Sequence, residues 1–295
     1  AFDELSNIID TDDYWINENE SNKIDLSSFD FDTIKPNFLS IIKEEDRELT
    51  FSNLLQHFLS DKSILKDFCD EVLETDIDVK NADISVNREE HNIDLIIRDG
   101  KNIIVIENKI LSGINGTNKN YSEQLNKIFG NEQDTVEDKN SEKGHTEQEN
   151  TEQESKKEIL EDLLKNLKTE AESKLKDNKL IISQLSKYYF YAQKIAVEEG
   201  VDKDNIKLYI ICPQYQAKFY DKENLKQYLY GEEYTTKTYK DLLVFFEKHY
   251  NGDDFYLKEF IDAMRKHAQP TNSSKEDEMK SRFIKAIMKA KNENE

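Results

Sequence analysis

The sequence contains little cysteine and no long apolar run, and each absence excludes a class of protein. Its two cysteines, Cys69 and Cys212, are too few for a disulfide framework or, by themselves, for a four-ligand zinc site. We expect both to be buried thiols. No window approaches the roughly 18 consecutive apolar residues of a membrane span, and residues 1–13 are acidic where a signal peptide would be basic and then apolar. These features predict a cytoplasmic protein that has no contact with membranes.

Basic residues are also scarce relative to acidic ones. The 295 residues include 62 acidic and 41 basic ones, which gives a net charge of −21. Such a chain is usually a poor partner for nucleic acid, whose phosphates attract Lys and Arg. The charge is uneven, however, because residues 1–48 carry −10 whereas residues 181–295 contain 19 residues of each sign. The total therefore does not exclude a phosphate-binding surface.

The chain is predicted to consist of three parts. Residues 1–35 form an acidic arm, residues 36–270 a globular domain, and residues 271–295 a basic C-terminal helix. A large polar insertion, residues 112–180, interrupts the domain. Its middle contains almost no apolar residue and cannot bury enough surface to offset chain entropy. We expect part of the insertion to be a mobile loop and part, over 157–174, a solvated helix.

Apolar spacing predicts the elements of the globular domain. Residues 51–59 carry an amphipathic helical stripe, and two runs of Ile and Val flank Asp99-Gly100 as a β-hairpin. The remaining predicted elements are helices over 64–73, 181–197 and 239–249 and a strand over 207–212. The order helix, hairpin, helix, strand, helix indicates an α/β domain.

Three ionisable residues lie within or next to the predicted hairpin: Asp94, Glu107 and Lys109. Glu107 and Lys109 share a face because they are two positions apart. A two-residue loop, or a four-residue loop, is expected to place Asp94 opposite Val105 and diagonal to Glu107, at roughly 7–8 Å. A three-residue loop would put the two carboxylates on opposite faces. The interpretation of these residues as a metal site therefore depends on the turn.

Two carboxylates and a lysine at one sheet edge suit metal-assisted hydrolysis of a phosphodiester. Asp94 and Glu107 would hold a hard cation, Mg²⁺ or Mn²⁺, and Lys109 would position water and stabilise negative charge. The alternative interpretation is a surface patch of salt bridges, because charged faces are ordinary on half-solvated hairpins.

The same residues resemble a known family. Asp94 followed by Glu107-Asn108-Lys109, within Ile-Glu-Asn-Lys, is similar to the core of the PD-(D/E)XK (restriction-endonuclease-like) nuclease superfamily, and most similar to its bacterial branch with this strand. Ile93 stands where the superfamily's name has Pro. The resemblance covers roughly residues 40–110 and 181–213. It implies a restriction-endonuclease-like α/β core, with a central mixed β-sheet flanked by helices.

The resemblance implies two further site residues. Glu48 matches a helical Glu that reaches toward the metal, and its alternative role is a first-turn acid favoured by the helix dipole. Gln184, in Gln-Leu-Ser-Lys-Tyr, matches a Gln-Leu-x-x-Tyr helix that completes the site. Gln124 could supply the same group, but we prefer Gln184 because Tyr188 has the expected spacing and a strand follows.

Nucleic acid is expected to contact a few basic residues. Lys187 lies close in sequence to Gln184, and Lys280, Arg282 and Lys285 belong to a basic helix with an apolar face. A terminal helix with an ordinary solvated face is an equal alternative.

These features predict an enzyme: a Mg²⁺-dependent nuclease that acts on DNA. One alternative is a non-catalytic or regulatory protein-binding module on the same fold, in which the acidic arm or the insertion recruits a protein partner. Another is an acidic mimic of DNA, which would not need the hairpin carboxylates. The presence of both Glu107 and Lys109 favours the nuclease.

Overall fold

The computed structural model describes residues 37–79, 85–87, 92–117, 119–130, 147–178 and 180–269. All of them belong to one compact unit, residues 37–272. The acidic arm at 1–35, the basic helix at 271–295 and the polar middle of the insertion at 131–146 lie outside the described residues.

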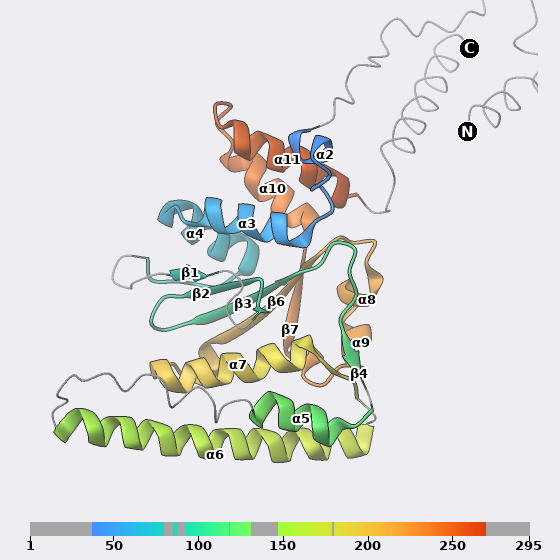
Figure 1. The fold of residues 1–295 in the computed structure, drawn as a ribbon. Coiled ribbons are helices and arrows are strands. Elements are labelled where there is room, and N and C mark those ends of the chain that lie inside the picture. Colours follow the sequence, from blue (N-terminus) through green and yellow to red (C-terminus); the bar gives the residue numbers. More distant parts are fainter. Residues whose placement is uncertain are drawn as a thin grey trace, which may run out of the picture. The chain divides into compact units, whose positions relative to one another are not determined.

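The centre of the fold is a mixed sheet with the order β1-β2-β3-β6-β7 (Figure 1). The strands are β1 (Ser85–Asn87), β2 (Leu95–Arg98), β3 (Ile103–Asn108), β6 (Ile206–Cys212) and β7 (Tyr234–Thr238). β1, β2 and β3 pair antiparallel, whereas β3, β6 and β7 pair parallel. β3 is buried along its whole length, because it lies in the middle of the sheet with helices on both faces. The prediction of a restriction-endonuclease-like α/β core is confirmed.

The hairpin loop has one of the two expected lengths but gives a different register. The loop between β2 and β3 has four residues, 99–102, and Leu95 pairs with Ile106. The Asp99 carboxylate sets this loop, because it accepts hydrogen bonds from the backbone N–H groups of Lys101 at 2.8 Å and Asn102 at 2.5 Å.

This loop moves the pairing by two positions from the expected register. Asp94 immediately precedes β2, so continuing the ladder places it opposite Glu107, and the expectation that it would lie opposite Val105 is wrong. Because side chains alternate with a period of two, a shift of two keeps both carboxylates on one face.

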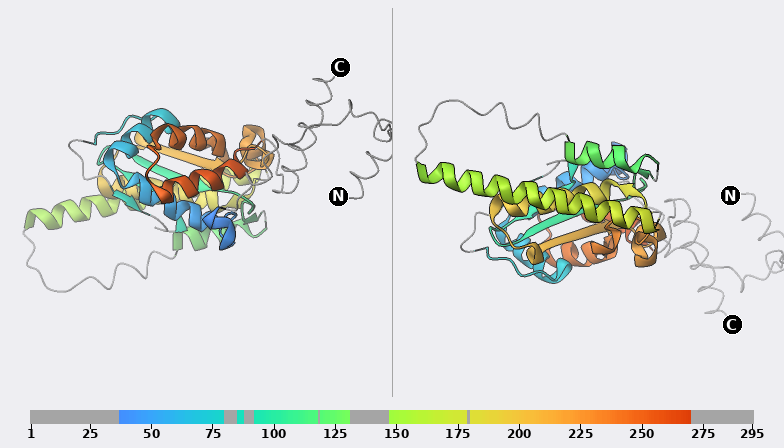
Figure 2. Two further views of the ribbon diagram at one scale, coloured as in Figure 1. Left: turned by 90° about the horizontal axis from the view of Figure 1, so that it is seen from above. Right: turned by 90° about the horizontal axis from the view of Figure 1, so that it is seen from below.

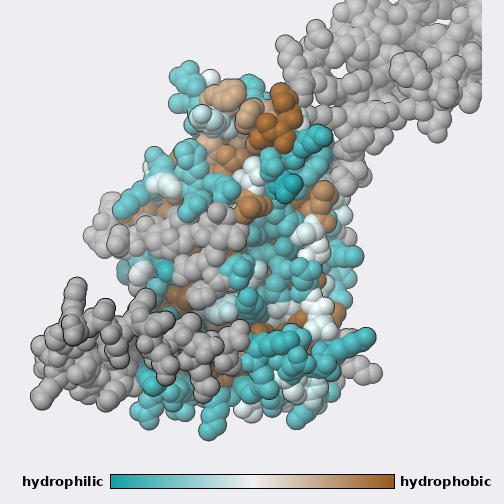
Figure 3. All heavy atoms as spheres, in the orientation of Figure 1, coloured by the Kyte–Doolittle hydropathy of each residue, from teal (hydrophilic) through white to brown (hydrophobic). Residues whose placement is uncertain are grey.

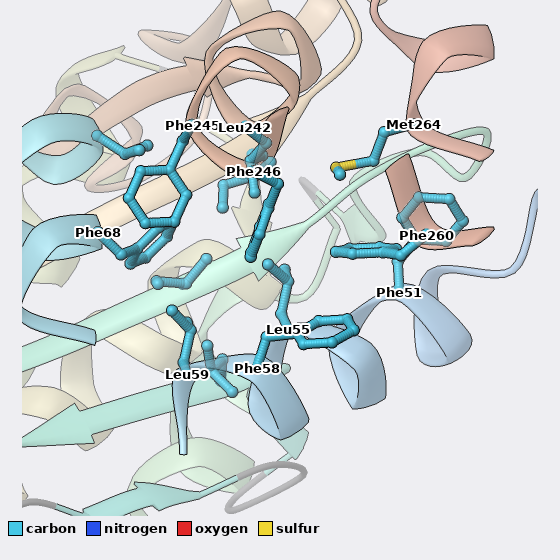
Figure 4. Packing of buried hydrophobic residues seen from close by; sticks show 14 of the residues in the cluster. Phe51, Leu55, Phe58, Leu59, Phe68, Leu242, Phe245, Phe246, Phe260 and Met264 are labelled. Atoms are coloured by element: carbon cyan, nitrogen blue, oxygen red, sulfur yellow. The ribbon is translucent and has the colours of Figure 1, made fainter. Parts of the chain in front are cut away.

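Helices rich in Phe cover one face of the sheet. They are α2 (Phe38–Ile41), α3 (Glu48–Leu59), α4 (Lys62–Phe68), the π-helical turn η4 (Cys69–Leu73), α10 (Tyr239–His249) and α11 (Phe255–His267). The stripe predicted on residues 51–59 packs here, and Phe51, Phe58 and Phe260 lie together in Figure 4. Burying this stripe places the first residue of α3, Glu48, near the end of β3.

The opposite face is covered by α7 (Gln184–Glu199). Its residues Leu185, Tyr188 and Ala192 pack on β3 and β6. A helix was expected from residue 181, but it begins at 184, because Ser183 is extended and caps α7 through a reciprocal pair of hydrogen bonds with Ser186. Ile182 and Ser183 instead form β5, which pairs with β4 (Gly116–Thr117).

The insertion contains more ordered structure than predicted. It forms α5 (Tyr121–Gly130) and α6 (Glu147–Asn178), and α6 is longer than the expected 157–174. Leu125, Leu167, Ala171 and Leu175 are buried in a small core shared with α7, so these helices form an outer layer (Figure 1). The N-terminal half of α6 extends beyond the sheet in both views of Figure 2.

The remaining described elements are short. α8 (Ala217–Tyr220) and α9 (Lys222–Leu225) lie between β6 and β7 in the chain. Cys69 and Cys212 are buried free thiols, as predicted. No helix of the described part of the chain is both long and apolar enough to cross a bilayer. The face drawn in Figure 3 is mostly hydrophilic, with apolar side chains gathered near α2 and α11. Within α2, Phe38 and Ile41 are exposed.

Candidate active site

The candidate site lies where β3 ends. Glu107 and Lys109 are both buried on one face of the strand, and Asp94 approaches from the neighbouring strand. The Asp94 carboxylate accepts a hydrogen bond of 2.7 Å from the backbone N–H of Asn108. The local fold thus brings together the three residues that the hairpin pattern singled out.

Glu107 has two different carboxylate oxygens. Oε1 accepts a hydrogen bond from Nε2 of Gln184 and lies 2.6 Å from Nζ of Lys109. Oε2 is buried and has no hydrogen-bond partner among the described residues. Burial, together with the charge of Asp94, raises the pKa of Glu107 to about 8, although Lys109 acts in the opposite direction. A buried oxygen without a partner is a group that a cation would satisfy.

Lys109 lies between two carboxylates. Its Nζ is 2.6 Å from Oε1 of Glu107 and 3.6 Å from Oε2 of Glu48. Burial lowers the pKa of Lys109, but the attraction of Glu107, Glu48 and Asp94 outweighs it and leaves the pKa raised. The ammonium group is therefore charged at neutral pH, at the point where negative charge is concentrated.

Glu48 faces the chain segment that follows β3. Its Oε1 accepts hydrogen bonds from the backbone N–H groups of Ile110 at 2.7 Å and Ser112 at 3.0 Å. The Ser112 hydroxyl lies 2.6 Å from Oε2. Burial raises the pKa of Glu48, but Lys109 and these hydrogen bonds outweigh it, so the pKa is lowered. The Glu48 carboxylate thus holds this segment in place.

Gln184 connects Glu107 to the start of the insertion. Its Nε2 donates to Glu107, while its Oε1 accepts from the backbone N–H of Asn115 at 3.3 Å. The backbone N–H of Gln184 donates to the carbonyl of Asn115 at 3.1 Å. The rival Gln124 lies in α5, within the outer layer. The structure thus places Gln184 at the hairpin.

The basic residues predicted to contact nucleic acid lie in α7 or outside the described residues. Lys187 lies one turn after Gln184 in α7, with its Nζ 5.4 Å from the centre of the Tyr191 ring. Lys280, Arg282 and Lys285 lie outside the described residues. Sequence reasoning missed Ser112 and Asn115, whose only signal is their position directly after the Glu107–Lys109 motif.

The carboxylates do not form a closed metal cage. Among the described residues, no group of three or more His, Cys, Asp or Glu is arranged to hold a metal ion. Two contacts explain this, because the Lys109 ammonium lies between Glu48 and Glu107, and the segment after β3 occupies Oε1 of Glu48. Oε2 of Glu107 is the buried carboxylate oxygen of this group that has no hydrogen-bond partner among the described residues.

The comparisons with known proteins agree with this arrangement. Residues 36–179 match the family model of the PD-(D/E)XK nuclease superfamily, and the match includes Glu48, Asp94, Glu107 and Lys109. Over these residues, which make up just under half of the chain, the sequence is similar to that superfamily. Its members are generally nucleases, which supports hydrolysis of phosphodiester bonds as the activity. No curated protein and no solved structure matches the chain.

Proposed function

We propose that this chain is an endonuclease that cleaves DNA with the help of Mg²⁺ or Mn²⁺. The observation that carries the proposal is the buried, unpartnered Oε2 of Glu107 on the same sheet face as Asp94. Two carboxylates suit Mg²⁺, which is usually held by about one or two protein carboxylates together with phosphates of the substrate.

Asp94 and Glu107 would hold the cation, and Glu48 would support it through Oε2, the oxygen that faces Lys109. When bound, the cation would polarise the scissile phosphate and lower the pKa of the attacking water. A bound cation would lower the raised pKa of Glu107, because a positive charge beside a buried carboxylate favours its ionised form.

The protein's own residues would do the rest of the chemistry. Lys109 would orient the attacking water through its ammonium group and stabilise the negative charge that develops on the phosphate. Gln184 would hold Glu107 in its orientation, because its amide joins the carboxylate to the backbone of Asn115.

DNA would reach the site past basic side chains. Lys187 is the candidate phosphate contact in the described part of the chain, and Lys280, Arg282 and Lys285 remain candidates from the sequence. The net charge of −21 predicts weak non-specific affinity for DNA and leaves a role for a protein partner at the acidic arm or insertion.

Nicking of a supercoiled plasmid with Mg²⁺ or Mn²⁺ tests this function. The wild-type chain should cleave the plasmid only with the cation, and Asp94→Ala and Lys109→Ala should not cleave it. Cleavage that survives both substitutions would reject this site. A parallel assay with single-stranded RNA decides the substrate, and Mn²⁺ binding without cleavage of either nucleic acid would reject the nuclease.

A further inference from the structure

The side chain of Asn108 points away from the carboxylates and into the helical layer on the other face of the sheet. It is 1% exposed. Its Nδ2 donates to the backbone carbonyl of Glu48 at 3.1 Å and lies 3.3 Å from the hydroxyl of Ser52. One amide therefore connects the end of β3 to the first turn of α3.

The backbone of Asn108 makes a second connection. Its N–H donates to the Asp94 carboxylate at 2.7 Å. Asn108 also lies between Glu107 and Lys109 in the chain. Through this one residue, Asp94 and Glu48 are held relative to the strand that carries the other two groups of the site.

Tyr239 fixes the orientation of this amide. Its hydroxyl donates to Oδ1 of Asn108 at 2.6 Å. An amide has an acceptor end and a donor end, so a donor facing Oδ1 leaves Nδ2 to face the carbonyl of Glu48. Without the Tyr239 hydroxyl, a buried Oδ1 would lack this donor, and rotation of the amide would cost less.

Tyr239 is itself held firmly. It is the first residue of α10, whose N-terminus is capped by Thr238 and Asp241 through a reciprocal pair of hydrogen bonds. Its ring packs edge-on against Phe51 of α3, with centroids 5.4 Å apart, and lies 5.4 Å from the ring of His267. The helix cap and the ring packing therefore fix the position of the Tyr239 hydroxyl.

We infer that Tyr239 is a positioning residue for the active site, which acts through Asn108 to set Glu48 and Asp94 relative to Glu107 and Lys109. This inference rests on the proposed function. It assigns a role to an aromatic residue more than a hundred positions away in the chain, in a helix that lies outside the match to the family model.

The test compares Tyr239→Phe with Tyr209→Phe. Tyr209 is a matched control, because it is also a buried tyrosine and donates to a backbone carbonyl, that of Leu73, at 2.7 Å. Each substitution removes one buried hydroxyl, so the two should lower thermal stability to a similar extent. Only Tyr239→Phe should affect the site.

Two measurements on the full chain separate positioning from general stability. The first is the Mn²⁺ concentration that raises the melting temperature half-maximally. The second is the rate of plasmid nicking at saturating DNA, together with the KM for DNA. Tyr239→Phe should weaken Mn²⁺ binding and slow nicking by about 10-fold each, the lower end of the effect of removing an outer partner of a metal site, and KM should stay unchanged.

Asn108→Asp provides a second variant. It keeps the acceptor for Tyr239 but replaces the donor that faces the Glu48 carbonyl with an acceptor, so it should weaken Mn²⁺ binding and slow nicking at least as much as Tyr239→Phe. Equal behaviour of Tyr239→Phe and Tyr209→Phe in both measurements would overturn the inference while leaving the nuclease intact. A wild-type chain that neither binds Mn²⁺ nor cleaves nucleic acid would overturn the proposed function itself.

Discussion

Lys109 and Glu107 share the buried end of β3, with Nζ of the lysine 2.6 Å from Oε1 of the glutamate. A fixed ammonium group and a mobile cation both neutralise the same carboxylate, so they compete for it. Under the proposed function, Lys109 would thus have two opposite effects on the site, because it would assist the chemistry and oppose the binding of the cation.

Lys109→Met should separate these effects. We expect plasmid nicking to fall by about 100-fold or more, because a charged group that acts on the reacting atoms is lost. Mn²⁺ binding, measured by calorimetry, should stay the same or become tighter. Glu107→Gln is the comparison and should lose both properties. Loss of Mn²⁺ binding in Lys109→Met would contradict the assignment of the cation to Asp94 and Glu107.

Gln184→Ala should slow nicking by about 10- to 100-fold, because Glu107 loses the amide that orients it. Gln124→Ala in α5 is the matched control, since it removes the same side chain from the outer layer. It should leave the nicking rate unchanged. If Gln124→Ala were the slower variant, Gln184 would not be the residue that completes the site.

Gly116→Ala should separate β4 from β5. A Cβ at this position would lie 2.6 Å from Cγ2 of Ile181 and 2.8 Å from the carbonyl oxygen of Ile182, and the backbone atom cannot easily move. We expect a loss of about 1–3 kcal/mol in the free energy of unfolding, measured with urea, as for other overpacked sites. Slower nicking should accompany it, because the adjacent Asn115 bonds to Gln184.

Gly113→Ala is the control for this substitution. Apart from its chain neighbours, no atom of the described residues would lie within 4 Å of a Cβ at this position, so this variant should match the wild type in stability and nicking. Similar losses of stability and nicking in both variants would show that replacing any glycine of this segment has the effect, and that the contact with Ile181 and Ile182 is not its cause.

His267 should make stability depend on pH. Its Nε2 lies 2.6 Å from the carbonyl oxygen of Glu45, so this nitrogen carries the proton, and Nδ1 accepts from the Tyr215 hydroxyl at 3.0 Å. Burial lowers the pKa of His267 below its usual 6.5, against the opposing effects of the Glu45 carbonyl and the Asp46 charge. The folded ring is therefore neutral where the unfolded one becomes charged.

This difference in the pKa of His267 between the folded and unfolded chains determines how stability changes with pH. As pH falls below about 6.5, the unfolded chain takes up a proton that the folded chain does not, so stability decreases. Urea unfolding at several pH values should show the stability advantage of the wild type over His267→Gln shrinking toward acid. The same substitution at exposed His57 controls for the loss of a histidine. An advantage that is constant with pH would contradict the prediction.

Local patterns predicted the elements that form the site. The stripe that includes Phe51 and Phe58 indicated α3, and the run of Ile and Val indicated β3, because the spacing of apolar residues reports which face is buried. Those two elements bring Glu48 close to Lys109. The predicted hairpin register was wrong by two positions, because the register depends on hydrogen bonds that the Asp99 carboxylate accepts from the backbone, which apolar spacing does not report.

Long-range partners could not be predicted in the same way. In the sequence, Asn108 is an ordinary polar residue in a motif and Tyr239 an ordinary aromatic residue at the start of a helix. Only the fold brings the Tyr239 hydroxyl within 2.6 Å of Oδ1 of Asn108. A helix over 157–174 was predicted, but its packing into an outer layer was missed for a related reason. Its core consists of a few residues such as Leu125 and Leu167, scattered among charged ones, and these are buried only because α7 lies beside them.

The parallel pairing of β3 with β6 has a consequence for the synthesis of this protein. Ile103 pairs with Ile206, so the sheet that carries the site closes only after the whole insertion has been made. A growing chain that has just emerged with Glu107 and Lys109 still lacks Gln184 and Tyr239, and domains generally fold as units. Under the proposed function, a translation product that ends before Gln184 should therefore lack nuclease activity.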